Sequence, residues 1–240
     1  MRIAIDGTDE IAARTARVLF AERDVSHIGF MQSGMPQLGK RTAPAEDLET
    51  YDVVVSTGET AATDLIARAS VLGVPLVLWH DEPGLHRGPS TMPVVVSANL
   101  GSGLAPSLVH HPSAAVTSSD TVKIAWTELG RPLRKGEAVT FPDPVGPRWA
   151  AKRGNGQLVA RTTDEWSGAI VTVRGPGGER IVGVSDLGTH LEALTLASVA
   201  LLTAGGTYGP SIGDASEHGA ELLERAMEME LDVAVWSSSL

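Results

Sequence analysis

Short apolar segments alternate with amphipathic ones over the first hundred residues, and this alternation constrains the fold more than any other feature. The apolar segments are rich in Val, Ile and Leu and lie at Arg2–Asp6, Val25–Phe30, Tyr51–Ser56, Val74–Trp79 and Pro93–Ala98. Helical patterns follow the first and third of them, at Glu10–Glu22 and Thr60–Leu72, and Gly73 is a suitable helix stop. Continuously apolar strands joined by helices predict a doubly wound, parallel, Rossmann-like α/β sheet that is covered on both faces.

The pattern changes after Asn99 and becomes rich in strands. Strands are predicted at Val122–Leu129 and Glu137–Phe141, and Gly175–Gly178 marks a hairpin between strands at Ala169–Arg174 and Arg180–Ser185. A change from alternating strands and helices to successive strands indicates a second domain of a different class.

Two domains are therefore expected. The first is a Rossmann-like dinucleotide-binding domain at residues 1–105, and the second is an α+β domain with a mixed or antiparallel sheet at residues 106–240. Gly101–Gly103 is predicted as a turn before a connecting helix at Leu104–His110, and the three prolines between 142 and 147 as a stiff loop. Helices at 189–204 and about 216–229 are candidates to return to the first domain, and a final strand is predicted at Leu231–Trp236.

The composition excludes several classes of protein. The chain has 240 residues and a net charge of −10, so we do not expect it to bind nucleic acid. It has no cysteine, which excludes disulfides and thiolate metal sites. No apolar run approaches the roughly 18 residues of a membrane-spanning helix, and the chain starts with a strand rather than a signal peptide. We therefore expect a cytoplasmic protein that binds a small molecule and neither nucleic acid nor membrane, with homo-oligomer formation left open.

The turn Gly7–Ala12 has the layout of a dinucleotide-binding connection between a strand and a helix. In the pattern G-x-G-x-x-G/A, Gly7 takes the first position and Ala12 the third, but Asp9 replaces the middle glycine, where a carboxylate repels phosphate. Two interpretations stay open. Either the backbone N–H groups after Gly7 hold a dinucleotide while Asp9 turns away, or Thr8 or Asp9 is simply the helix cap.

Further candidates follow the other strands, because ligands of an open α/β sheet bind beyond the carboxyl ends of its strands. Gln32 and Ser33 stand where an acid usually holds the adenosine ribose, and Lys40 or Arg41 can meet a 2′-phosphate if the loop folds back. An ordinary strand exit is the simpler explanation of Gln32, and a helix cap explains Thr57 equally well. The predicted cofactor-binding residues are Gly7, Thr8, Asp9, Glu10, Gln32, Ser56, Thr57, Gly58 and Asn99.

Three histidines are candidates for acid–base catalysis, and the sequence singles out none of them. His80 begins a polar cluster after a strand, whereas His110 and His111 end the connecting helix. A solvated loop explains the first, and a polar helix end explains the other two. The spacing of His80 and its acidic neighbours matches no metal-binding motif, so no metal site is predicted.

Two parts of the chain, Ser97–Leu104 and Gly178–Ile181 followed by Leu196–Leu202, resemble segments of the dihydrodipicolinate reductase and saccharopine dehydrogenase-like families. The first is similar to the crossing from the dinucleotide domain to the substrate domain in those two-domain reductases, and the second to the returning strand and its helix. The resemblance implies a Rossmann-type oxidoreductase architecture. It does not imply the family's reaction, because Ala114 stands where the His-His-x-x-Lys motif of the reductases has its lysine.

These features predict an oxidoreductase-like protein that uses NAD or NADP on a small polar metabolite. The basic residues that are candidates to meet substrate carboxylates are Lys123, Arg134, Lys135 and Arg148. The alternative is a non-catalytic Rossmann-type protein, a nucleotide sensor or scaffold, that has lost cofactor binding. Asp9 and the missing ribose acid favour this alternative, whereas the strand–turn–helix start and the two-domain layout favour an enzyme.

Overall fold

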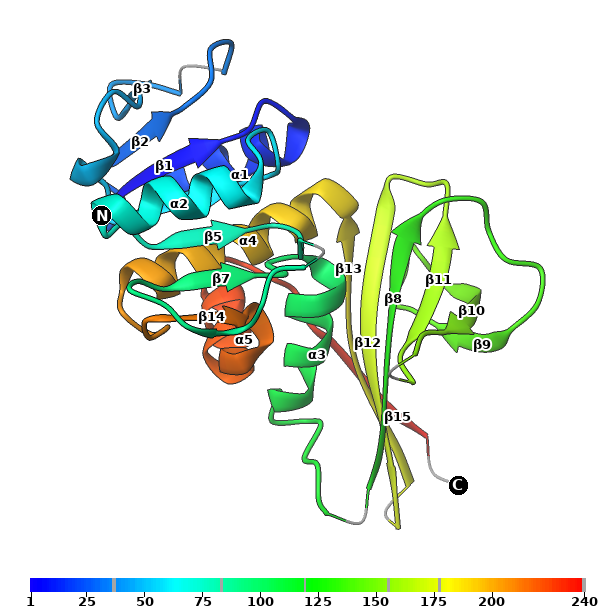
Figure 1. Ribbon diagram of the computed structural model, residues 1–240. Coiled ribbons are helices and arrows are strands. Elements are labelled where there is room, and N and C mark those ends of the chain that lie inside the picture. The colour runs from blue at the N-terminus through cyan, green and yellow to red at the C-terminus, as the bar shows by residue number, and fades with distance from the viewer. Residues whose placement is uncertain (36–37, 83, 119, 155, 177, 239–240) are drawn as a thin grey trace. The chain divides into compact units, whose positions relative to one another are not determined.

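The computed structural model describes residues 1–35, 38–82, 84–118, 120–154, 156–176 and 178–238 (Figure 1). The chain forms two compact units. The first comprises Met1–Asn99 and Glu192–His218, and the second comprises Leu100–Leu191 and Gly219–Leu240. The domain boundary expected between residues 105 and 106 stays a prediction.

The first unit is built on an eight-stranded sheet. Its strands are β1 (Arg2–Asp6), β2 (His27–Phe30), β3 (Thr42–Pro44), β4 (Val53–Ser56), β5 (Leu76–Leu78), β6 (Gly88–Pro89), β7 (Val94–Val96) and β14 (Ser211–Asp214). Their order is β3-β2-β1-β4-β5-β7-β14-β6, and every neighbouring pair is parallel except β14 and β6. The predicted doubly wound parallel sheet is therefore confirmed, and its order reverses between β1 and β4.

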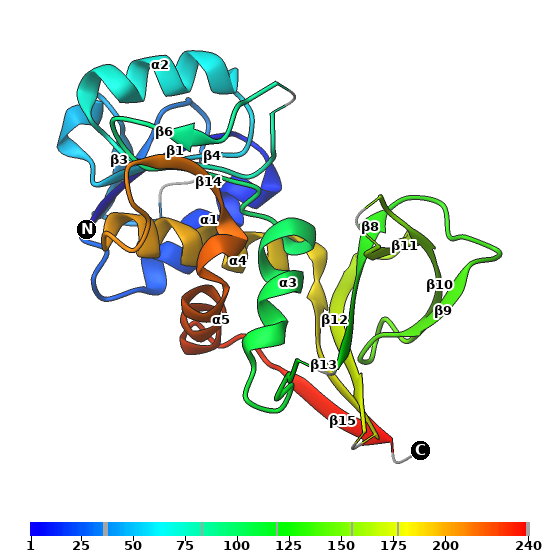
Figure 2. The same ribbon diagram turned by 60° about the horizontal axis from the view of Figure 1, so that its bottom comes forward.

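Helices cover both faces of this sheet. The helical segments are α1 (Glu10–Ala21), the 3₁₀ turn η1 (Leu48–Thr50), α2 (Ala62–Leu72), α4 (Gly188–Ala204) and the 3₁₀ turn η4 (Ala215–His218), and α4 belongs to this unit from Glu192 on. Figure 2 shows α2 on one face and α1 and α4 on the other. Right-handed crossovers that run in opposite directions from β1 and β4 place α1 and α2 on opposite faces.

Burial on both faces explains why these strands read as continuous apolar runs. Ile3, Ala4 and Ile5 are all fully buried, so neighbouring side chains that point to opposite faces both meet helices. The helix α2 ends where the sequence predicts, because Gly73 adopts the left-handed conformation with φ of 69°. The predicted irregular crossover between β5 and β7 is confirmed as well, since its described residues contain only the short strand β6.

The second unit carries a seven-stranded mixed sheet. Its strands are β8 (Thr121–Leu129), β9 (Glu137–Thr140), β10 (Pro147–Lys152), β11 (Leu158–Thr162), β12 (Trp166–Gly175), β13 (Gly178–Leu187) and β15 (Ala234–Ser238), in the order β15-β13-β12-β8-β11-β10-β9. Among the described residues of this sheet, β8 and β11 form the one parallel pair, and the other neighbours are antiparallel. The predicted mixed sheet and the β12–β13 hairpin are confirmed, and Gly177 of the hairpin turn lies outside the described residues.

The predicted loop between the three prolines is confirmed, because residues 142–146 form no strand or helix and Pro147 begins β10. The sequence analysis does not predict β10 and β11, and one local prediction in this unit is wrong. Gly101–Gly103 is not a turn, because Leu100–Leu104 is a π-helical segment (η2) that continues into α3 (Ala105–Ser107) and η3 (Leu108–His110). A Cβ on Gly101 would lie 2.5 Å from the indole nitrogen of Trp126, so this glycine serves close packing.

One further helix, α5 (Gly219–Glu228), belongs to the second unit. Just before it, Glu217 accepts a hydrogen bond at 2.9 Å from the backbone N–H of Asp214, which is half of the capping box that the sequence predicts there. No helix among the described residues combines the length and the apolar character that crossing a membrane requires.

Candidate functional site

The reversal of strand order places the carboxyl ends of β1 and β4 side by side. Asp6, the last residue of β1, is in register with Ser56, the last residue of β4. The backbone N–H of Thr57 donates to the carbonyl oxygen of Asp6 at 3.0 Å, so the residues that follow the two strands (the strand exits) stay hydrogen-bonded beyond the sheet. In an open α/β sheet this is the position at which ligands bind.

Gly7 is packed closely against the neighbouring exit. A Cβ on this residue would lie 2.1 Å from Oγ1 of Thr57 and 3.0 Å from Cβ of Ala12. Its φ lies outside the left-handed region, so the constraint is space rather than backbone conformation. The turn after β1 therefore needs glycine at its first position, as a dinucleotide-binding turn does.

Thr57 contributes a buried hydroxyl with no partner. The residue is 7% exposed, and its Oγ1 has no hydrogen-bond partner among the described residues. Buried polar atoms without partners are rare in folded proteins and mark places where a ligand or water completes the bonding. This hydroxyl lies directly under the Gly7 turn.

Asp9 is the N-cap of α1. Its Oδ1 accepts the backbone N–H of Ala12 at 2.7 Å, so the cap interpretation of this residue is confirmed. Thr8 instead donates its hydroxyl to Oε2 of Glu59 at 3.0 Å. Asp9, Glu59 and the exposed Glu10 give the outer side of the turn a negative charge, which weakens its attraction for a phosphate.

Asp6 lies beneath the turn and was missed in the sequence. It is fully buried, and its carboxylate accepts four hydrogen bonds. Oδ2 accepts from the Ser56 hydroxyl at 2.8 Å and the Thr60 N–H at 3.0 Å, and Oδ1 from the Thr60 hydroxyl at 2.8 Å and Nε2 of Gln32 at 3.1 Å. One carboxylate thus ties together the exits of β1, β2 and β4. Its signal in the sequence is an acid that ends an apolar strand directly before the glycine.

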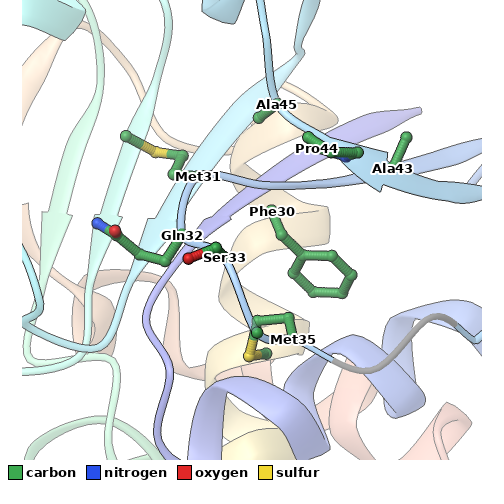
Figure 3. Close-up of a pocket in the computed structure, with 9 residues that line it drawn as sticks. Phe30, Met31, Gln32, Ser33, Met35, Ala43, Pro44 and Ala45 are labelled. Atoms are coloured by element: carbon green, nitrogen blue, oxygen red, sulfur yellow. The ribbon is translucent and has the colours of Figure 1, made fainter.

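A pocket of about 420 Å³ opens where β2 ends (Figure 3). It is lined by Phe30–Met35 and Ala43–Ala45. Figure 3 shows Gln32 extending away from Phe30 and Met35, with its amide nitrogen outermost. Mostly apolar walls with a few polar groups are typical of small-molecule sites.

Arg41 has no role in this pocket, contrary to one prediction from the sequence. Its guanidinium donates to the carbonyl oxygens of Phe20 at 2.5 Å and Val25 at 2.7 Å, and it lies 4.2 Å from the centre of the Phe20 ring. The side chain therefore pins the end of α1 to the start of β2. Lys40, the other candidate for a 2′-phosphate, is exposed.

His80 follows β5 and stacks on Trp79, with 3.9 Å between ring centres. Burial lowers the pKa of His80 from its ordinary value, and the charges of Glu82 and Asp9 act in the opposite direction. The ring is therefore mostly neutral at neutral pH and can accept a proton. Because Asp9 influences His80, the structure brings the exits of β1 and β5 into one electrostatic environment.

Asn99 supports the residue on which His80 stacks. Its side-chain amide donates to the carbonyl oxygen of Trp79 at 2.9 Å, and the indole of Trp79 donates to Oε2 of Glu192 at 2.8 Å. Ser97, between β7 and Asn99, is buried and adopts a φ of 59°, which is strained for a residue other than glycine. Such strain gathers at functional sites, so the exits of β5 and β7 belong to the candidate site.

His110 and His111 lie in the second unit. A Cβ on Gly219 of α5 would lie 2.9 Å from the ring of His110, so this ring packs against that helix. His111 accepts the backbone N–H of Ser113 through Nδ1 at 3.2 Å, as a residue at a helix end does. Both contacts fit a structural role, and a catalytic role for either residue stays a prediction.

Two of the basic residues predicted to meet a substrate already have carboxylate partners. Lys123 pairs with Glu137 at 2.5 Å, and Arg148 pairs with Asp164 at 3.2 Å. Exposed pairs of this kind contribute little to stability. In the part of the chain that the structure describes, no three His, Asp or Glu side chains gather as a metal site requires.

Comparison with known proteins identifies the fold. No family model and no curated protein sequence matches the chain. Among solved structures, dihydrodipicolinate reductase from Paenisporosarcina sp. TG-14 matches with a TM-score of 0.57 and 11% identity, over 90% of this chain and 98% of that one. Homospermidine synthase from Legionella pneumophila, in complex with NAD, matches with a TM-score of 0.62 and 9% identity. The match covers 99% of this chain and 91% of the synthase chain. An engineered D-amino acid dehydrogenase bound to NADP+ matches with a TM-score of 0.53 and 13% identity. The match covers 93% of this chain and 95% of the dehydrogenase chain.

This protein therefore has the Rossmann-type fold of two-domain reductases and dehydrogenases. The resemblance to dihydrodipicolinate reductase that two short segments suggest is confirmed at the level of the fold. At 9 to 13% identity the likeness extends to the fold alone.

Proposed function

We propose that this protein is an NAD(P)-dependent oxidoreductase that acts on a small polar metabolite. The observation that carries the proposal is Gly7, which is packed against Thr57 where the strand order reverses. Solved structures that share the fold over nearly the whole chain include one in complex with NAD and one bound to NADP+. The alternative of a non-catalytic protein is not favoured, because the proteins named in these structures are enzymes.

The residues at this site fit a nicotinamide dinucleotide in two respects and oppose it in one. The close approach of backbone at Gly7 and the unpartnered hydroxyl of Thr57 suit a pyrophosphate at the start of α1. The charge of Asp9 opposes it, although that carboxylate is held on its own helix. We infer that a dinucleotide binds here, with lower affinity than at a turn with glycine in the middle position.

A bound nicotinamide supplies hydride transfer. The protein binds and orients the cofactor and the substrate, and one of its side chains accepts or donates a proton. Gly7 and Thr57 would hold the phosphates, and the pocket of Phe30–Met35 and Ala43–Ala45 would hold the adenosine end. His80, whose pKa is lowered by burial, accepts or donates the proton at an imidazole nitrogen. Stacking on Trp79 fixes the plane of this ring.

A binding titration tests the proposal. We expect NADH or NADPH to raise the melting temperature and to change its own fluorescence on mixing, because a ligand that binds only the native state stabilises it. The comparison variant is Asp9→Asn, which keeps a helix cap, removes the charge that opposes the phosphates and should strengthen the response. If neither nucleotide changes either signal at millimolar concentration, the proposal is wrong.

The cytoplasmic location expected from the sequence stays a proposal, and homo-oligomer formation stays open. Light scattering on the purified protein at several concentrations tests whether the protein forms oligomers.

A further inference from the structure

Trp79, the residue that follows β5, is held by hydrogen bonds to three distant parts of the first unit. Its backbone N–H donates to the carbonyl oxygen of Ser56 at 3.0 Å. Its backbone carbonyl oxygen accepts the side-chain amide of Asn99 at 2.9 Å, and its indole N–H donates to Oε2 of Glu192 at 2.8 Å. The first two bonds fix the backbone of Trp79, whereas the bond to Glu192 acts on its ring.

The bond to Glu192 is suited to selecting one orientation of the indole. The indole N–H can only donate, and a carboxylate is among the strongest acceptors in a protein. Such a bond should favour the bonded orientation of the Trp79 ring about tenfold over the others. Glu192 lies on α4 beside the fully buried Ala193, so a rigid helix carries the acceptor.

The imidazole of His80 takes its orientation from this indole. The two ring centres are 3.9 Å apart, and the ring planes meet at 29°. Within the described part of the chain, the His80 ring makes no hydrogen bond of its own. The stack on Trp79 is therefore the directional contact that the structure provides for the His80 ring.

We propose that Glu192 is a positioning residue for proton transfer: by accepting the indole N–H of Trp79, it fixes the ring on which His80 stacks and so the direction in which the imidazole presents its nitrogens. This inference rests on the proposed function, in which His80 exchanges the proton. It assigns the effect to the hydrogen bond of Glu192 and not to its charge.

Proton NMR of the His80 ring tests the inference, because stacking on an indole moves the ring resonances upfield. His80→Gln identifies the signals by their loss. In the natural protein we expect them upfield of the signals of an exposed histidine. Glu192→Ala keeps a good helix former and removes the acceptor, so about half or more of this displacement should be lost. Glu192→Gln should retain it, because the amide oxygen also accepts the indole N–H.

Two controls separate the hydrogen bond from other effects. The spectra are compared at about pH 8.5, where histidine is neutral in every variant. Glu82→Gln removes a charge that acts on His80 and leaves the bond between Trp79 and Glu192 in place, so the displacement should not change. In a Trp79→Phe background, which lacks the indole N–H, Glu192→Ala should cause no further change.

Exchange of the Trp79 indole proton with D₂O checks the bond without any substitution at Glu192. We expect this proton to exchange more slowly than the proton of an exposed indole, because a hydrogen-bonded proton must first be released. Exchange at the rate of an exposed indole would overturn the inference.

The other outcomes are equally decisive. The inference is wrong if the His80 signals lie at the positions of an exposed histidine, or if Glu192→Ala leaves them unchanged. It is also wrong if Glu192→Gln loses the displacement as Glu192→Ala does, or if the effect of Glu192→Ala persists without the indole of Trp79.

A separate titration with NADH and NADPH distinguishes this inference from the proposed function. If the natural protein binds either nucleotide and the His80 signals fail the test, the inference alone is wrong. If neither nucleotide binds, the proposed function is wrong, and the role of Glu192 in proton transfer falls with it.

Discussion

Two carboxylates, Asp6 and Asp9, flank Gly7 at the end of β1 and at the start of α1. Asp6 is fully buried and accepts four hydrogen bonds that come from the exits of β2 and β4. Asp9 is exposed and accepts a hydrogen bond from an amide of its own helix. The same residue type thus organises the interior of the site in one position and its outer charge in the other.

The difference teaches that burial and the number of donors decide what a carboxylate does. A buried carboxylate is tolerated only where hydrogen-bond donors replace the water it has lost. The donors around Asp6 therefore fix the orientation of its carboxylate. An exposed carboxylate keeps its water and acts through its charge and one local bond. We therefore expect changes at Asp6 to affect stability, and changes at Asp9 to affect affinity.

The largest effect is expected for Asp6→Ala. It leaves the donors of Ser56, Thr60 and Gln32 without their acceptor, which should lower the free energy of unfolding by about 3 kcal/mol. Asp9→Ala loses only a helix cap and should cost about 1 kcal/mol. Urea denaturation of both variants measures the difference. Equal losses would show that the buried network contributes no more than a cap.

Gly7→Ala should have the next largest effect. The new methyl group would overlap Oγ1 of Thr57, at 2.1 Å, and overpacking of this kind costs about 2 kcal/mol. Thr57→Ala removes that oxygen, which has no partner to lose, so the double variant should recover most of the stability. Thermal denaturation of the two single variants and the double variant measures the coupling. Additive losses would mean that the two residues do not meet.

Asp9→Asn separates the charge of Asp9 from its cap. Asparagine caps a helix as well as aspartate does, so stability should change little. Removal of the charge should strengthen NADH binding about three- to tenfold, because the phosphates then meet no carboxylate. Asp9→Gly should also strengthen binding. An unchanged affinity in both variants would show that Asp9 is a cap and nothing more.

The smallest effect concerns the titration of His80. Burial lowers its pKa in the folded protein below the ordinary value of 6.5, so the folded state binds this proton less readily than the unfolded state. Its contribution to stability is therefore present above pH 6.5 and is lost as the pH falls through the folded pKa. Asp9→Asn should lower the pKa further, because the charge of Asp9 raises it.

Proton NMR of the His80 ring measures its pKa in the natural protein and in the Asp9→Asn variant. A midpoint at or above 6.5 in the natural protein would contradict the role of burial.

Much of the first unit could be predicted from the sequence. The strands β1, β2, β4, β5 and β7 are mostly buried, so their apolar runs are continuous and their order along the chain is visible. The strands β3, β6 and β14 are short and partly exposed, and the sequence analysis does not predict them. Strands of the second unit were harder to recognise where they are short and half exposed. In β10, Trp149 is 46% exposed and its neighbours are polar or small, so neither apolar pattern appears, and Pro147 suggests a loop.

The site could be predicted in outline and not in detail. The exits of β1, β2 and β4 were recognised because ligands gather at the carboxyl ends of parallel strands. Asp6 was missed because its partners lie 26 to 54 residues away along the chain, and no local pattern reports such contacts. Arg41 was one of two candidates for a phosphate because its charge is visible in the sequence and its backbone partners are not.

The order of apolar and amphipathic segments was enough to specify a doubly wound parallel sheet, because each strand and helix records its own burial in its periodicity. The helix cap at Asp9 was also within reach, since its partner is three residues away. What Asp6, Gln32 and Thr57 do depends on strands that meet only after folding. Their roles follow from burial and from hydrogen bonds between distant segments, which exist in the folded chain and leave no trace in the linear order of residues.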